Sequence, residues 1–113
     1  MRFKSVTRHA DQSLSGTPAR FESFDGKLYI DNKKVLKGWE SYSGWYWFGT
    51  EKAWKQDSVI GGRTYEDDQI WYGYVQGLED EWGHFSQTEL DLLKPRVWPI
   101  RKQDLPHAGR RRR

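Results

Sequence analysis

Side chains able to catalyse a reaction are rare in this sequence, and one arrangement resembles a nucleophilic site. His84 and Ser86 are two residues apart in a stretch typical of a β-strand, so their side chains would point to the same side. Glu79 and Glu81 lie just upstream, across a turn. A Ser–His–acid site needs the nucleophile and the base in hydrogen-bond contact. Ser86 also occupies the N-cap position of a predicted helix, and we therefore expect no enzyme activity.

Two groups of three consecutive acids could bind a hard cation such as Mg²⁺ or Ca²⁺ through their oxygens. Neither group has the alternating spacing and central glycine of a calcium loop. The chain has no cysteine and 3 histidines, which excludes a thiolate zinc site. We therefore expect no metal and no cofactor. The two acidic groups are Glu66-Asp67-Asp68 and Glu79-Asp80-Glu81.

Aromatic side chains are frequent, with 7 Trp, 6 Tyr and 5 Phe in 113 residues. Trp and Tyr are residues that often anchor protein interfaces. Five of these rings are in or beside predicted loops, where they either close the ends of an aromatic core or contact a partner. With the two acidic groups, we expect them to form an aromatic and acidic surface for a protein partner. They are Trp39, Tyr42, Trp54, Tyr65 and Trp82.

The formal charge of +3 is unevenly distributed. Residues 40–94 carry 4 basic and 11 acidic side chains, whereas residues 95–113 carry 7 basic and 1 acidic. The acidic centre could mimic a phosphate backbone and occupy a host nucleic-acid-binding or defence protein. The alternative is nucleic-acid binding through aromatic stacking and basic side chains. The candidate nucleic-acid contacts are Lys33, Lys34, Lys37, Arg96, Arg101, Lys102, Arg110, Arg111, Arg112 and Arg113.

The elements that must position these residues are mainly predicted strands. Asp25-Gly26 predicts a hairpin with a type I′ turn between two short strands. Trp45–Phe48 and Ile70–Val75 are aromatic strands with rings on both sides. Because side chains alternate along a strand, either both faces are covered or one face displays rings to a partner. We expect Gln56 to Gln69 to form a long polar loop between them.

One helix is predicted, over Gln87–Lys94. Ser86 and Glu89 form a capping box at its start, and Pro95 ends it. Prolines are expected to keep Val97 to Leu105 extended. The sequence thus predicts the α+β class: a small antiparallel β-sheet (meander) with one short capped helix packed on it.

We expect three regions along the chain. Residues 1–19 form a flexible basic segment or an edge strand, residues 20–106 a single α+β domain, and residues 107–113 a disordered Arg-rich tail. The sequence contains no apolar run long enough to span a membrane and no secretory signal, so we expect a cytoplasmic protein. Monomer and homodimer both remain open.

About half of the chain, residues 45–105, resembles a small uncharacterised family of bacterial, plasmid and phage proteins. The shared pattern is an aromatic strand, a Gly-Tyr-Val-x-Gly-Leu-Glu strand and turn, and a Phe-Ser-x-x-Glu-Leu capped helix. His84 and Gln87 depart from it, because the family usually has Tyr and Leu there. The resemblance implies a phage or mobile-element context and no particular reaction. The matching residues are Trp45–Glu51, Ile70–Glu79, Gly83–Ser86, Glu89-Leu90 and Pro99–Leu105.

Overall fold

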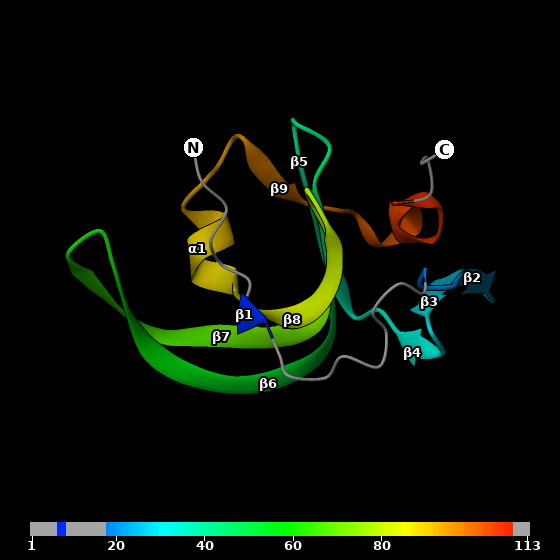
Figure 1. Cartoon of the computed structure of the whole chain (residues 1–113). Helices are drawn as coiled ribbons and strands as arrows, with labels where there is room; N and C mark the ends of the chain where they lie inside the picture. The colour runs from blue at the N-terminus through cyan, green and yellow to red at the C-terminus, as the bar shows by residue number, and fades with distance from the viewer. Residues whose placement is uncertain (1–6, 9–17, 110–113) are drawn as a thin grey trace.

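A large antiparallel sheet of six strands forms the centre of the molecule, with strand order β1-β8-β7-β6-β5-β9. The structure, a computed structural model, describes residues 7–8 and 18–109. Figure 1 shows the large sheet curving around α1, with the smaller sheet β2-β3-β4 beside it. The strands of the large sheet are β1 (Thr7–Arg8), β5 (Lys37–Ser41), β6 (Tyr46–Ile60), β7 (Arg63–Gln76), β8 (Asp80–Ser86) and β9 (Val97–Pro99). Those of the small sheet are β2 (Phe21–Phe24), β3 (Lys27–Ile30) and β4 (Lys33–Lys34).

The hairpin of β6 and β7 is much longer than the aromatic segments within it. Its pairing continues to Ile60 and Arg63, and Gly61-Gly62 makes the turn with φ angles of 61° and 82°. The predicted polar loop from Gln56 to Gln69 is therefore wrong. Two glycines suit a two-residue hairpin turn, and the polar side chains are accommodated because most of this half of the hairpin is exposed. We call residues 51–69 the arm.

Three register shifts interrupt the pairing of β6 with β7. They fall between positions 49 and 51, 52 and 54, and 56 and 58 of β6. An extra residue on one strand bends that strand and increases its twist. These irregularities account for the strong curvature of the hairpin in Figure 1, and they change which side chains face α1.

Two hydrophobic cores lie on opposite faces of the large sheet. Trp47 and Phe48 are consecutive and fully buried, yet each belongs to a different core. Of the two alternatives for the aromatic strand, the structure therefore shows both faces covered. The helix-side core contains Trp39, Trp47, Trp71, Val75, Phe85, Leu90 and Val97. The small-sheet core contains Leu28, Ile30, Val35, Tyr46, Phe48, Tyr74, Trp82, Leu105 and Ala108.

The helix α1 is short, covering Gln87–Asp91 rather than Gln87–Lys94. Its start is as predicted, because the Ser86 Oγ accepts a hydrogen bond from the Glu89 amide at 3.0 Å. The predicted α+β class is wrong: two antiparallel sheets dominate the chain and the helices are short. The predicted and observed classes differ because the segment expected to form a loop belongs to two strands, and because the helix ends four residues before Pro95. None of the helices in the described part of the chain has the length and apolar character that crossing a membrane requires.

The C-terminal segment is folded beyond the residue at which the sequence predicts the domain to end. After β9 it forms a 3₁₀ helix, η1 (Lys102–His107), which contains Pro106. The expectation of an extended segment to Leu105 is therefore wrong for its second half. Ala108 and Gly109 are buried, and Gly109 lies against Phe48, so the folded domain extends beyond the predicted boundary at residue 106. Residues 110–113 lie outside the described residues.

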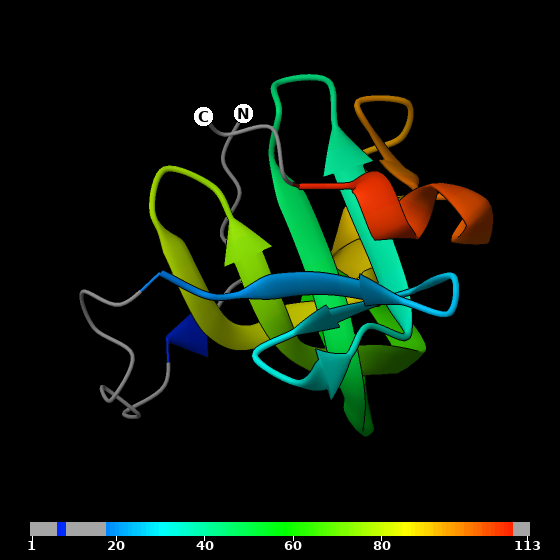
Figure 2. The ribbon, with the colours of Figure 1, turned by 90° about the vertical axis from the view of Figure 1, so that its right-hand side faces the viewer.

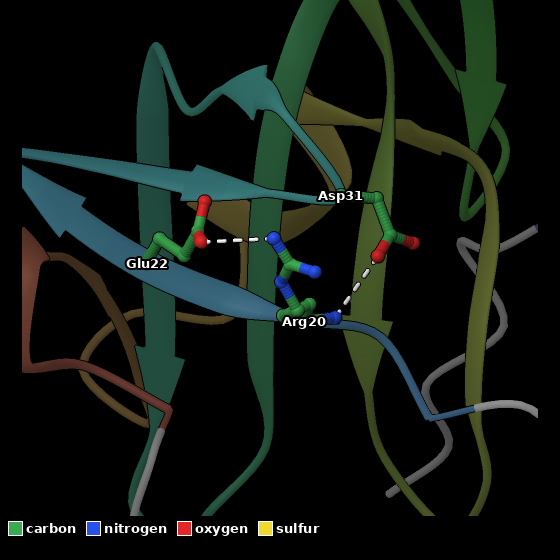
Figure 3. A network of polar contacts seen from close by, with 3 residues as sticks. All are labelled: Arg20, Glu22 and Asp31. Carbon is green, nitrogen blue, oxygen red and sulfur yellow. Dashed lines mark hydrogen bonds and ion pairs between the residues drawn. The ribbon is translucent and has the colours of Figure 1, made fainter.

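The small sheet begins with the predicted hairpin. Asp25 and Gly26 have φ angles of 56° and 74°, as a type I′ turn requires, which confirms the prediction. Figure 2 shows β2 and β3 crossing over the strands of the large sheet. In Figure 3, Arg20 joins the start of β2 to the end of β3. Its backbone amide donates to Asp31 Oδ1 at 2.9 Å, and its guanidinium pairs with Glu22 at 3.0 Å.

The N-terminal region adds one short edge strand to the large sheet. Thr7 pairs with His84 and Arg8 with Gly83, which places β1 beside β8. The sequence left a flexible segment and an edge strand open for residues 1–19, and the edge strand is observed at these two positions. The predictions for residues 1–6 and 9–17 lie outside the described residues.

Candidate functional site

A cleft of about 410 Å³ lies between the arm, β8 and α1, and we call it the arm cleft. Trp54 and Asp57 reach it from β6, His84 from β8 and Glu89 from α1. Ser58 also lines it. The arm cleft thus gathers an aromatic ring, two carboxylates and hydroxyl groups from elements that are separated in the sequence by up to 35 positions.

Trp54 forms a wall of the arm cleft with 47% of its surface exposed. Its ring centroid lies 4.8 Å from that of His84, which in turn lies 5.2 Å from Tyr72. The Trp54 Nε1 donates to Gln56 Oε1 at 2.8 Å. The ring therefore packs against His84 and is hydrogen-bonded through its Nε1 to Gln56, while nearly half of its surface stays exposed.

The hydrogen bonds continue from Trp54 into the interior. Gln56 Nε2 donates to Ser58 Oγ at 3.0 Å, and Ser58 Oγ donates to Asp68 Oδ2 at 2.7 Å. Ser86 Oγ donates to the same carboxylate oxygen at 2.6 Å, and the Thr88 amide donates to Asp68 Oδ1 at 2.9 Å. The chain of hydrogen bonds ties the arm to the start of α1.

Asp68 is the centre of this network and is 1% exposed. Burial by itself would raise the pKa of Asp68, because it disfavours the charged carboxylate. The hydrogen bonds from Ser58, Ser86 and Thr88 favour the charged form and together hold the pKa below its ordinary value. A buried carboxylate is thus stabilised as an anion by donors from three elements, which gives it a structural role.

The Ser–His arrangement considered from the sequence has a different use in the structure. Ser86 and His84 both lie on β8, as expected. The Ser86 hydroxyl donates to Asp68 and accepts from the Glu89 amide, so its donor is committed to a carboxylate. The Ser86 hydroxyl thus links Asp68 to the start of α1.

The five aromatic candidates are separated by the fold. Tyr42 and Trp54 are exposed, and Tyr65 is half-buried under Arg63, whose guanidinium lies 5.8 Å from the ring centroid. Trp39 and Trp82 are buried, one in each core, which corrects the expectation that they form part of a contact surface. Their hydrophobic area is used by the two-sided packing of the large sheet.

The acidic candidates do not form one surface. Glu66 and Asp67 are exposed near the start of β7, whereas Asp68 is buried and removed from any contact surface. The second group follows the other end of β7, where Glu79 and Asp80 are exposed and Glu81 is half-buried. The two acidic groups therefore lie near opposite ends of β7 and do not combine into one acidic surface. No group of three or more potential metal ligands converges among the described residues.

The basic candidates are also dispersed. Lys33 lies 5.4 Å from the Trp82 ring centroid and Lys37 lies 5.5 Å from that of Trp39. These rings belong to different cores, so the two lysines lie toward opposite faces of the large sheet. Arg101 is paired with Asp104 at 3.0 Å. Lys34, Arg96 and Lys102 are exposed, and Arg110 to Arg113 lie outside the described residues.

Sequence reasoning missed Asp57 and Glu89 as residues of a site. The sequence predicts a loop at Asp57, whereas the residue lies at the third register shift of β6. The sequence pattern assigns Glu89 only to the capping box of α1. The spacing of Asp57 and Glu89 in the sequence does not indicate that they meet. A bulge in a strand and the start of a helix bring them to one cleft.

No family model, curated protein or solved structure matches this chain. The resemblance to the phage and plasmid family, and the context it implies, therefore stay predictions.

Proposed function

We propose that the protein is a small non-enzymatic binding protein that recognises a protein partner through the arm cleft. The observation that carries the proposal is the half-exposed Trp54 ring in one cleft with the carboxylates of Asp57 and Glu89. A ring with nearby carboxylates suits a cationic side chain, which gains both a cation–π interaction and charge attraction. The partner would insert an arginine or lysine side chain into the cleft.

The hydrogen-bond chain supports this proposal because it prepares the cleft before a partner arrives. Trp54 is restrained by Gln56 and His84, and the arm is anchored through Asp68 to α1. Binding to a restrained ring loses less conformational entropy than binding to a mobile one. The partner class that this charge favours is a basic protein, such as the host nucleic-acid-binding protein expected from the acidic centre of the sequence.

The test is affinity capture from a bacterial lysate followed by titration of the purified captured protein. Trp54→Ala and Asp57→Asn should each reduce capture, and Trp54→Ala should weaken the measured affinity by about 30-fold, as truncation of an interface anchor does. Phe24→Ala is the matched control, since Phe24 is an exposed aromatic residue on β2, far along the chain from the arm. Capture that is equal for Trp54→Ala and the wild type, or no captured protein at all, would contradict the proposal.

A further inference from the structure

A second cleft, of about 630 Å³, lies where β6 and β7 face α1. Three lysines line it: Lys37 from β5, and Lys52 and Lys55 from β6. Gln87 and Thr88 of α1 line it as well. We call it the lysine cleft. No residue lines both this cleft and the arm cleft, so the two are separate sites on the molecule.

The register shifts of β6 explain how two of the lysines reach the same cleft. Residues three apart on a regular strand point to opposite faces. Lys52 pairs with Trp71 and Lys55 pairs with Gln69, and one register shift lies between them. The extra residue restores the same face for both side chains. Trp54 lies between them and faces the arm cleft instead.

Among the described residues, the lining of the lysine cleft carries more positive than negative charge, with three lysines against the carboxylates of Asp67 and Asp91. In the part of the chain that the structure describes, none of the three lysines is in an ion pair. The carboxylates of Asp67 and Asp91 line the cleft without pairing with them. An excess of positive charge in a concave site raises the local attraction for an anion.

The cleft walls favour phosphate groups over aromatic ligands. Lys52 lies 6.0 Å from the Trp71 ring centroid, but Trp71 is only 2% exposed and provides no open face for a base to stack on. The Trp71 Nε1 donates to Gln87 Oε1 at 2.9 Å, so the Gln87 amide group is fixed with its NH₂ as the remaining donor. Lysine ammonium groups bind phosphate as compact point charges.

We propose that the lysine cleft binds a phosphate-bearing anion with at least two negative charges. The charge comes from Lys37, Lys52 and Lys55, and the side-chain NH₂ group of Gln87 supplies a further hydrogen bond. This binding is independent of the proposed protein partner, because it uses a different cleft and the opposite charge.

Isothermal titration calorimetry of the full chain with inorganic tripolyphosphate tests the proposal. We expect saturable binding that Lys52→Gln/Lys55→Gln weakens by at least about tenfold, since each loss removes a charge-assisted contact. The matched control is Lys27→Gln/Lys94→Gln, which changes the net charge equally and lines neither cleft. Thermal unfolding of every variant without ligand establishes that the fold is retained.

Three results would overturn the proposal: no binding of tripolyphosphate to the wild type, an equal loss in the control, or no loss in the Lys52/Lys55 variant. An equal loss would show general charge attraction rather than a site. ATP, titrated in parallel, distinguishes the source of the phosphate. Affinity comparable to that of tripolyphosphate supports recognition of phosphate alone, whereas binding of ATP without binding of tripolyphosphate would contradict it, because the base would then supply the affinity.

Discussion

At the scale of single residues, Asp68 shows how a charge pattern can mislead. In the sequence it is the third of three consecutive acids and looks like part of a solvated acidic surface. In the structure it points inward and receives hydrogen bonds from Ser58, Ser86 and Thr88. A buried carboxylate that lost these donors would be strongly destabilising. The residue therefore contributes to the rigidity of the arm and not to a contact surface.

Asp68→Asn should lower the free energy of unfolding at pH 7 by about 2–3 kcal/mol. The amide keeps the volume of the side chain but removes the charge that strengthens three hydrogen bonds. Glu66→Gln is the control, because Glu66 is an exposed neighbour on the same strand. Urea denaturation of both variants measures the difference, and equal stability of the two variants would contradict this role.

The same pair of proteins gives a pH test. The folded-state pKa of Asp68 is lowered from the ordinary value of 3.8. Its contribution to stability is therefore present above that value and is lost as the pH falls through the folded-state pKa. The stability difference between wild type and Asp68→Asn should be constant well above pH 3.8 and should shrink as the pH falls below that value. A difference that does not change with pH would argue that shape, not charge, is responsible.

At the scale of elements, the β6–β7 hairpin decides where the functional candidates lie. Its strands approach closely at Gly73, where a Cβ atom would collide with the backbone of Phe48 and Gly49. Gly49 in turn leaves space for the ring of Trp71, since an added Cβ would lie 2.5 Å from it. Glycine is used here for close approach between strands, whereas Gly61-Gly62 is used for the turn.

These two uses of glycine predict different costs. Gly73→Ala should destabilise the protein by about 3 kcal/mol, because the new methyl group meets backbone that cannot move aside. Gly62→Ala should cost about 1–2 kcal/mol, because its Cβ meets no atom within 4 Å and only the positive φ of 82° is unfavourable. Chemical denaturation ranks the two variants, and a larger cost for Gly62→Ala would reverse the interpretation.

At the scale of the whole molecule, one sheet serves two cores, and the small sheet and η1 complete one of them. Both cores contain residues from β6, β7 and β8. Because the same strands contribute to both cores, loss of packing in one core should also destabilise the other. The aromatic content of the chain is largely explained by this two-sided packing, which leaves Trp54 and Tyr42 as the exposed rings among the five candidates.

Cooperative unfolding follows from the shared strands. Trp47→Leu opens the helix-side core and Phe48→Leu the small-sheet core, and each should lower the melting temperature by about 4 °C or more. Far-UV and near-UV circular dichroism should report one coincident transition for both variants. If Phe48→Leu released the small sheet at a lower temperature than the rest, the two cores would be independent units.

Local features of the sequence determined several parts of this protein without help from the rest of the chain. Asp25-Gly26 specifies its turn because few residue pairs adopt two positive φ angles, and Ser86 starts α1 because its hydroxyl oxygen accepts the Glu89 amide. The alternation of Trp45 to Phe48 predicted two aromatic faces, since side chains on a strand must alternate.

Only the tertiary structure decided which of these features remain available for binding. Strand pairing turned the expected loop into the arm. Packing of Ala108 in the small-sheet core and of Gly109 beside Phe48 and Gln76 brought the end of the described chain into the fold. The bulges in β6, which placed Trp54 in one cleft and Lys52 and Lys55 in another, have no local signature. Their positions follow from how β7 pairs with β6 across the whole hairpin, and burial of a residue such as Asp68 depends on partners distant in sequence.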